Sequence, residues 1–174
     1  DIVKPPKGGK INWHIGGVGK TAINKNRRKW NEIIKDAEDM LHPKVLDKLS
    51  SILLSRRKNS RARYIPRNKN ILMGGEDTGI FIHEFGHHFE HEAAYYDKAK
   101  AFLSSRTVGE MKTRIYNAEY GWKDKFFNHY CGKDYMHKST EIISMGIQRM
   151  YENPFDFYET DKEYFEFILK IMWG

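Results

Sequence analysis

The residues of this chain whose types and spacing could do chemistry are the two histidines and the glutamate of HEFGH at positions 83–87. On a helix, residues four apart lie on one face at about 6 Å, so the imidazoles of His83 and His87 can converge on one metal ion. Glu84 lies about 100° round the helix from His83, beside such an ion, where a carboxylate can take a proton from water. The HExxH spacing therefore predicts a hydrolytic metal centre.

The same pattern also occurs by chance, and its simplest alternative is a pair of hydrogen-bonded surface histidines. In this sequence the flanking side chains are apolar: Ile80, Phe81, Ile82, Phe85 and Phe89. Imidazoles that are half buried in such a helix need polar partners, and a metal ion supplies them. We therefore favour the metal site over the pair of surface histidines.

A zinc centre with two histidines from one helix needs a third protein ligand. The extended metzincin pattern would require glycine and histidine at positions occupied by Glu90 and Ala93, so that class is excluded. His91 lies two helical turns, or about 12 Å, along the axis from His83, which is too far for one ion. The third ligand must therefore come from another part of the chain.

Glu141 is the best candidate for this third ligand, because two histidines and a glutamate are an established catalytic zinc set. It lies in the first turn of a predicted apolar helix, where a carboxylate also suits the helix dipole, and this is its alternative role. His137 and His129 are rival ligands from an irregular aromatic stretch, and Glu119 is the next carboxylate to consider.

Helices and a small sheet must hold these residues in place. Apolar side chains three or four apart predict helices, and two extended stretches around Pro66 predict a hairpin just before the motif. The expected fold class is α+β, mostly helical, with a small sheet packed on the HExxH helix, and residues 21–174 are expected to form one domain. The expected segments are an irregular basic arm at 1–20, helices within 21–56, the sheet at 60–75, the motif helix at 78–96, further helix at 97–118, an irregular aromatic stretch at 121–138, the third-ligand helix at 139–152 and a last helix at 161–172.

Positive charge is concentrated in the first part of the chain. Residues 1–72 hold 18 Lys and Arg against 6 Asp and Glu, whereas residues 73–174 hold 12 against 17. Such a region attracts nucleic acid, an acidic protein or an anionic surface, although most charge runs are solvated faces. No helix-turn-helix, zinc-finger or RNA-binding motif accompanies it, so the sequence does not favour nucleic acid as a partner.

The composition excludes several classes of protein. With 40% hydrophobic residues in a length of 174, the chain can bury a core and is not disordered throughout. No apolar run approaches the roughly 18 residues of a transmembrane helix, so no membrane span is expected. The single cysteine, Cys131, allows neither an internal disulfide nor a zinc site built on cysteines.

A glycine-rich stretch near the N-terminus imitates a phosphate-binding loop. Residues 16–21 read GGVGKT, but the full pattern requires a glycine where His14 stands. We also expect no run of parallel strands after it, because the pattern downstream is helical. The sequence therefore favours a glycine-rich connector before the first helix over a nucleotide-binding site.

Two segments carry a resemblance to a known family. Residues 82–87 (IHEFGH), followed by Tyr135 and by residues 140–143 (TEII), resemble the anthrax-lethal-factor-like gluzincins. Residues 132–146 are also similar to peptidase domains attached to phage Mu-type head-morphogenesis proteins and to related mobile-element toxins. The resemblance extends over roughly residues 60–173 and is specific at these two segments.

The resemblance implies a zincin-like fold with one Zn²⁺ per chain, held by the two motif histidines and Glu141. It implies that Glu84 is the general base and that a tyrosine before the third ligand, here Tyr135, assists the transition state. In the family this tyrosine stands seven residues before the glutamate, whereas Tyr135 stands six residues before it. Tyr130 is therefore the alternative.

These features together predict a zinc-dependent endopeptidase acting on a protein or peptide substrate. An acidic substrate would suit the basic part of the chain. A peptide strand would lie along the sheet edge expected at 69–73. The alternatives are a binding or phage-assembly module with a structural metal, and a nucleic-acid-binding protein or NTPase. Because the chain begins at Asp1 without the apolar stretch of a signal peptide, we interpret it as a processed product or a domain of a larger phage, mobile-element or secreted protein.

Overall fold

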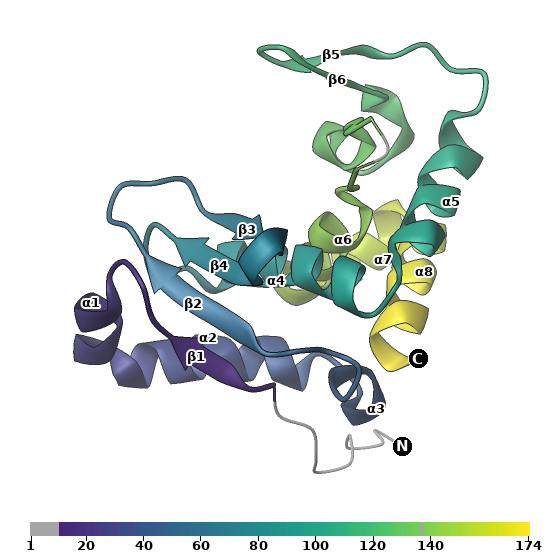
Figure 1. Cartoon of the computed structure of the whole chain (residues 1–174). Coiled ribbons are helices and arrows are strands. Elements are labelled where there is room, and N and C mark those ends of the chain that lie inside the picture. The colour runs from purple at the N-terminus through teal and green to yellow at the C-terminus, as the bar shows by residue number, and fades with distance from the viewer. Residues whose placement is uncertain (1–10, 137) are drawn as a thin grey trace.

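The computed structural model describes residues 11–136 and 138–174, and its fold is α+β and mostly helical, as predicted. In Figure 1 the main sheet and the N-terminal helices lie on one side, and the C-terminal helices lie on the other. Helix α4 (Thr78–Glu92) runs between them. The first ten residues of the predicted arm, and the rival ligand His137, lie outside the described residues. Within the described part of the chain, no helix has the length and apolar character that crossing a membrane requires.

The main sheet consists of parallel strands flanked at one edge by an antiparallel strand. Among the described residues its order is β1-β2-β4-β3, in which β1 (Trp13–Ile15), β2 (Ile52–Arg56) and β4 (Asn70–Met73) are parallel. β3 (Arg63–Ile65) pairs antiparallel with β4 across the turn η1 (Pro66–Asn68), and this confirms the predicted hairpin. Every residue of β4 is buried, because the strand lies between β2 and β3.

Strand β2 lies where the sequence predicts a helix, so the prediction of helices throughout 21–56 is wrong at its end. The helices of this region are α1 (Lys20–Lys25), α2 (Arg27–Asp39) and α3 (Pro43–Leu46). A short apolar run such as residues 52–54 has no periodicity that separates a buried strand from a buried helix. Pairing with β1 and β4 on either side makes the run a central strand.

Strand β1 is a second departure, because it lies in the arm at 1–20 that the sequence predicts to be irregular. The indole Nε1 of Trp13 donates a hydrogen bond to Glu38 Oε1 at 2.9 Å. The backbone N of Ile11 donates to the same oxygen at 2.9 Å. One carboxylate on α2 thus holds the start of the strand beside β2, and the prediction of an irregular arm is wrong for β1.

The glycine-rich stretch after β1 packs on the sheet. The expectation that no parallel strands follow it is wrong, since β1, β2 and β4 are parallel. Its backbone groups are nevertheless engaged with β2. Gly16 N donates to Leu54 O at 3.2 Å, and Val18 O accepts from Arg56 N at 2.9 Å. A Cβ atom at Gly19, where φ is 81°, would come within 2.0 Å of Arg56 O, so the stretch is a connector held against β2.

Helix α4 begins and ends at clear local signals. Asp77 caps its N-terminus, since the carboxylate Oδ1 accepts a hydrogen bond from Ile80 N at 2.9 Å. The helix ends at Glu92, before the predicted residue 96, because Ala94 takes a left-handed φ of 56°. The HExxH motif therefore lies in the middle of a regular helix.

The packing of α4 decides which parts of the chain meet at the motif. The helix contacts β3 and β4 on one side and α6 (Ile142–Glu152) on the other. At Gly86 a Cβ atom would come within 2.5 Å of Ser144 Cα, so the two helices approach backbone to backbone. This close approach brings the N-terminus of α6 up to the two histidines.

The C-terminal part is built around an aromatic cluster. Its further elements are α5 (Tyr96–Thr107), β5 (Thr113–Tyr116), β6 (Glu119–Gly121), η2 (Lys123–Lys125), η3 (His129–Gly132), α7 (Pro154–Thr160) and α8 (Lys162–Trp173). The prediction of helix through 97–118 is wrong after α5, because a β-hairpin turning at Asn117, with φ of 46°, follows. This hairpin projects away from the main sheet (Figure 1). The rings packed around Tyr164 are Phe102, Phe126, Phe127 and Phe157.

Candidate metal centre

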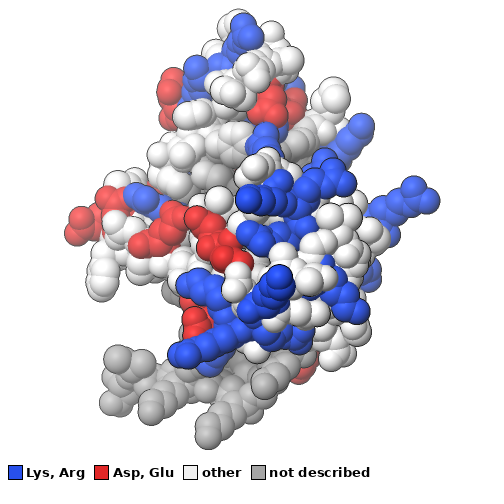
Figure 2. Space-filling model, turned by 90° about the vertical axis from the view of Figure 1, so that its left-hand side faces the viewer, with Lys and Arg blue, Asp and Glu red and all other residues white. Residues whose placement is uncertain are grey.

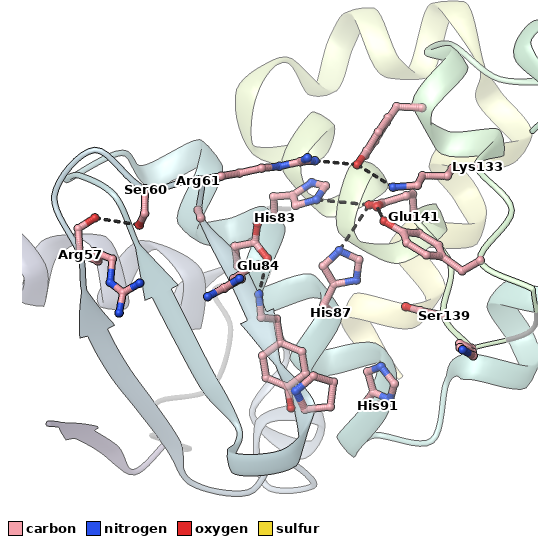
Figure 3. A pocket seen from close by; sticks show the side chains of 17 residues that line it. Arg57, Ser60, Arg61, His83, Glu84, His87, His91, Lys133, Ser139 and Glu141 are labelled. Atoms are coloured by element: carbon pink, nitrogen blue, oxygen red, sulfur yellow. Dashed lines mark hydrogen bonds and ion pairs between the residues drawn. The ribbon is translucent and has the colours of Figure 1, made fainter. Parts of the chain in front are cut away.

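Two histidines of α4 and a glutamate at the start of α6 meet at one point. The Nε2 atoms of His83 and His87 lie 3.2 and 3.3 Å from Glu141 Oε2. One ligand atom from each of the three residues lies within 4.8 Å of the others, close enough for a single metal ion to touch all three. Figure 3 shows both rings pointing at the carboxylate. The tertiary structure thus brings together the three residues that the sequence predicts as ligands.

The charges of this centre suit a cation. Glu141 is only 1% exposed, and burial alone would raise its pKa, but hydrogen bonds from His83 and His87 hold the pKa well below its ordinary value. Burial lowers the pKa of His87, and the contact with Glu141 outweighs burial and raises it. The two imidazoles therefore stabilise the charged form of the buried carboxylate, and this negative charge lies at the point where the three side chains meet. Two imidazoles and a carboxylate are also a donor set of catalytic zinc, so the residues fit that ion.

A side chain of α6 orients the first histidine. His83 Nδ1 lies 3.0 Å from Gln148 Oε1, and Gln148 Nε2 donates to Glu152 Oε1 at 2.8 Å. Because an amide oxygen can only accept, this contact places a proton on Nδ1, and Nε2, which faces Glu141, is the nitrogen that would bind a metal ion in place of its own proton.

The carboxylate of Glu141 is held by two hydroxyl groups. Ser144 Oγ donates to Oε2 at 2.9 Å, and the Tyr135 hydroxyl donates to Oε1. Glu141 is the N-cap residue of α6, but its side chain makes no capping hydrogen bond within the described residues. The carboxylate turns toward the histidines instead, which disfavours its alternative role at the helix terminus.

A buried carboxylate near the end of α4 positions the segment before Glu141. Glu90, which is 0% exposed, accepts hydrogen bonds from Thr140 N at 3.0 Å and from the hydroxyls of Thr140 and Ser139. Burial raises the pKa of Glu90, and these three donors partly offset that effect. Helix α4 thus supplies two candidate ligands and also anchors the segment that presents the third.

Sequence reasoning missed these supporting residues. Ser144 and Gln148 stand three and seven residues after Glu141, and Glu90 stands seven residues after His83. Residues three, four and seven apart share a helix face, so this spacing is the signal that could have found them.

Glu84 lies beside the three meeting side chains and faces the sheet. It is 7% exposed, and its Oε2 accepts a hydrogen bond from Tyr64 N at 2.7 Å. The N–H of Tyr64 therefore points away from β4, toward the open edge of β3 (Figure 3). The expectation that 69–73 forms the sheet edge is wrong, because β4 lies between β2 and β3, and β3 is the edge at the site.

The other candidate ligands lie outside the meeting point. The group of described side chains that could share a metal ion contains neither His91, nor His129, nor Glu119. His91 lines the surrounding cleft, and the Glu119 carboxylate pairs with Lys133 Nζ at 2.6 Å.

Both candidate tyrosines reach the cleft over the centre. The Tyr135 hydroxyl contacts Glu141. Burial, and to a lesser extent the negative charge of Glu141, raise the pKa of Tyr135, so its hydroxyl stays protonated. The Tyr130 hydroxyl accepts hydrogen bonds from Arg61 Nη2 at 2.8 Å and from Lys133 Nζ at 3.2 Å. Either hydroxyl could donate to a group bound in the cleft, and the variants described below separate them.

The cleft over the centre has a volume of about 710 Å³. His83, Glu84 and His87 line it from α4, β3 lines it from the sheet, and the segment between η3 and α6 lines it from the opposite side (Figure 3). A second hollow of about 670 Å³ also borders on His83 and Glu84 and extends toward the start of α4. An extended chain could therefore pass the centre on both sides.

In comparisons with protein-family models, curated proteins and solved structures, nothing matches this chain.

Proposed function

We propose that this protein is a zinc-dependent endopeptidase of the gluzincin type that hydrolyses peptide bonds in a protein substrate. The observation that carries the proposal is the meeting of His83, His87 and Glu141 within 4.8 Å at a cleft bordered by a strand edge. A zinc ion held by these three residues would supply Lewis-acid activation of water and of the scissile carbonyl.

Glu84 is assigned the proton transfers. Its carboxylate lies next to the candidate ligands without being one of them, at the level of Tyr64 on β3. It would accept a proton from the attacking water and deliver it to the nitrogen of the leaving amine. This pair of transfers regenerates the carboxylate after each turnover.

Tyr135 is assigned the hydrogen bond to the oxygen that becomes negative during attack. Its hydroxyl is protonated and lies at Glu141, beside the place where the carbonyl would bind. Tyr130 is the alternative donor.

The substrate would be an extended peptide added to the sheet at β3. Strand addition supplies backbone hydrogen bonds that do not depend on sequence, while side chains alternate between the two faces. The edge of β3 lies directly beside Glu84, because Tyr64 N donates to the Glu84 carboxylate, so a peptide added along this edge would come next to the proton-transfer group. The basic residues of the first part of the chain favour a substrate of acidic character.

The alternative is a binding or assembly module with a structural metal. Structural zinc sites are closed by four protein ligands, whereas catalytic sites keep an open position. Among the described residues three ligands meet, and they line an open cleft, which supports the catalytic proposal.

The test is incubation of the purified, zinc-loaded chain with a peptide library of mixed sequence, with and without a chelator, read by mass spectrometry. We expect about one zinc per molecule and cleavage that the chelator abolishes. Glu84→Gln is the matched control, because it should keep zinc and fold while losing cleavage. Zinc binding without any cleavage would favour the binding module, and absence of bound divalent metal would end the proposal.

A further inference from the structure

Basic side chains line the cleft on both of its sides. The Lys and Arg residues that line the cleft are Arg57, Arg61, Arg63, Lys133 and Lys138. Figure 2 shows Lys and Arg side chains gathered across the face that carries α1 and the loop between β2 and β3. The carboxylates that line the same cleft, Glu84 and Glu141, belong to the candidate centre and are already engaged there.

The three arginines among these side chains have no acidic partner within the described residues. Lys133 pairs with Glu119, but within the ranges that the structure describes no carboxylate lies within 4.0 Å of the guanidinium of Arg57, Arg61 or Arg63. A guanidinium can hold a carboxylate through two parallel hydrogen bonds. The cleft therefore presents positive charge that the fold does not use for its own ion pairs.

Among these arginines, Arg61 reaches a residue on the other side of the cleft. It extends from the loop between β2 and β3 across the cleft to the Tyr130 hydroxyl of η3 at 2.8 Å (Figure 3). Its partner is a neutral hydroxyl that also accepts from Lys133 Nζ. A carboxylate entering the cleft would be a better acceptor for Arg61 than this shared hydroxyl, because a charged acceptor forms a stronger hydrogen bond.

The direction of β3 indicates which part of a peptide would meet Arg61. Along β3, Arg63 pairs with Leu72 and Ile65 with Asn70, so the strand starts at the end of the cleft toward the beginning of α4. A peptide added antiparallel, the slightly more stable arrangement, passes Ile65 first and Arg63 last. Because Tyr64 is level with Glu84, residues on the C-terminal side of the scissile bond pass Arg63 and then Arg61.

We propose that Arg61, assisted by Arg63, forms a subsite for an Asp or Glu side chain on the C-terminal side of the scissile bond of an extended peptide. This inference rests on the proposed peptidase function. On entry of the substrate, the carboxylate takes the place of the Tyr130 hydroxyl on Arg61. Glu76 and Asp77, which line the second hollow, do not compete, because Glu76 Oε1 accepts from Asn26 Nδ2 at 2.9 Å and Asp77 caps α4.

The experiment uses peptides derived from a sequence that the protein cleaves, with Glu replaced by Gln at one position after the scissile bond in each member. For the wild-type protein, we expect kcat/KM to fall by about tenfold at one or two of these positions, and by less in high salt. Arg61→Ala should remove this discrimination, and Arg61→Glu should reverse it in favour of Gln. Arg67→Ala is the matched control, because Arg67 is exposed on η1 and is not among the residues that line the cleft.

Binding of fluorescently labelled Glu and Gln versions of extended library peptides to zinc-loaded Glu84→Gln separates this inference from the proposed function, because this measurement does not require cleavage. If the wild type cleaves no peptide, yet the variant binds Glu peptides about tenfold more tightly through Arg61, the peptidase proposal fails and the acidic subsite stands. If peptides are cleaved with equal kcat/KM for Glu and Gln, or if Arg61→Ala discriminates as the wild type does, the subsite is refuted. If a single-stranded oligonucleotide displaces the acidic peptide equally well, and Arg61→Ala weakens both equally, the surface is a general anion site and the inference is overturned.

Discussion

The contact between α4 and α6 at Gly86 offers a test of how the two halves of the candidate centre are joined. Gly86 lies between the two histidines in sequence, and a Cβ atom built there would lie 2.5 Å from Ser144 Cα and 3.1 Å from Ser144 N. Since these are backbone atoms, no rotamer change can relieve the contact. For Gly86→Ala, the helices must separate by about 1 Å to reach an ordinary packing distance.

The cost of this separation can be worked from its parts. Overpacking typically costs about 1–3 kcal/mol, while alanine in a helix interior gains about 1 kcal/mol over glycine. We therefore expect Gly86→Ala to lower the free energy of unfolding by about 0–2 kcal/mol, and the Tm by up to about 8 °C. The same separation moves Glu141 away from the imidazoles, and we expect zinc affinity to fall by about tenfold or more, as for other changes that disturb ligand orientation.

Gly75→Ala is the matched control, because nothing lies within 4 Å of a Cβ atom at that position. The assays are thermal unfolding of the metal-free protein and zinc titration against a chromophoric chelator. We expect the control to match the wild type in both assays. Should Gly86→Ala unfold at the temperature of the control and keep wild-type zinc affinity, the close contact of α4 and α6 would not be what holds the ligands together.

Three further predictions concern the roles of single residues. Glu141→Ala should weaken zinc binding by about two orders of magnitude or more, and His91→Ala should not, because only the first removes an atom from the meeting point; equal zinc affinities for the two variants would contradict the ligand assignment. Glu84→Gln should keep zinc and thermal stability but lower kcat by about 10²–10⁴-fold or more, and cleavage within about tenfold of wild type would assign the base elsewhere. In zinc-saturated protein, Tyr135→Phe should lower kcat by about 10²–10³-fold with little change in KM, whereas a loss confined to Tyr130→Phe would transfer the role to Tyr130.

The local parts of the candidate site could be predicted from the sequence. His83 and His87 share a helix face because their spacing is close to one helical turn, and this depends only on α4 being a helix. Glu141 could be singled out because few carboxylates lie at the start of an apolar helix. The hairpin of β3 and β4 likewise follows from extended residues on both sides of Pro66.

What the tertiary structure decided involves segments far apart in the chain. Residues 52–54 become a strand, and 13–15 pair beside them, because a parallel sheet gathers strands that no local pattern connects. The same assembly buries 70–73 and makes β3 the edge strand. A local pattern indicates which side chains are apolar but not which element covers them. The strands at 13–15 and 52–54, and the edge position of β3, therefore depended on the assembled sheet.

The surroundings of the candidate ligands were decided in the same way. Gln148 contacts His83 because α6 packs against α4, and Arg61 contacts Tyr130 because η3, which packs on α6, stands across the cleft from β3. The sequence by itself determined the types of these side chains and, through helical spacing, the neighbours that each has on its own element. Which elements meet depends on close packing between them, as where Gly86 admits the backbone of α6, and that packing is a property of the whole fold.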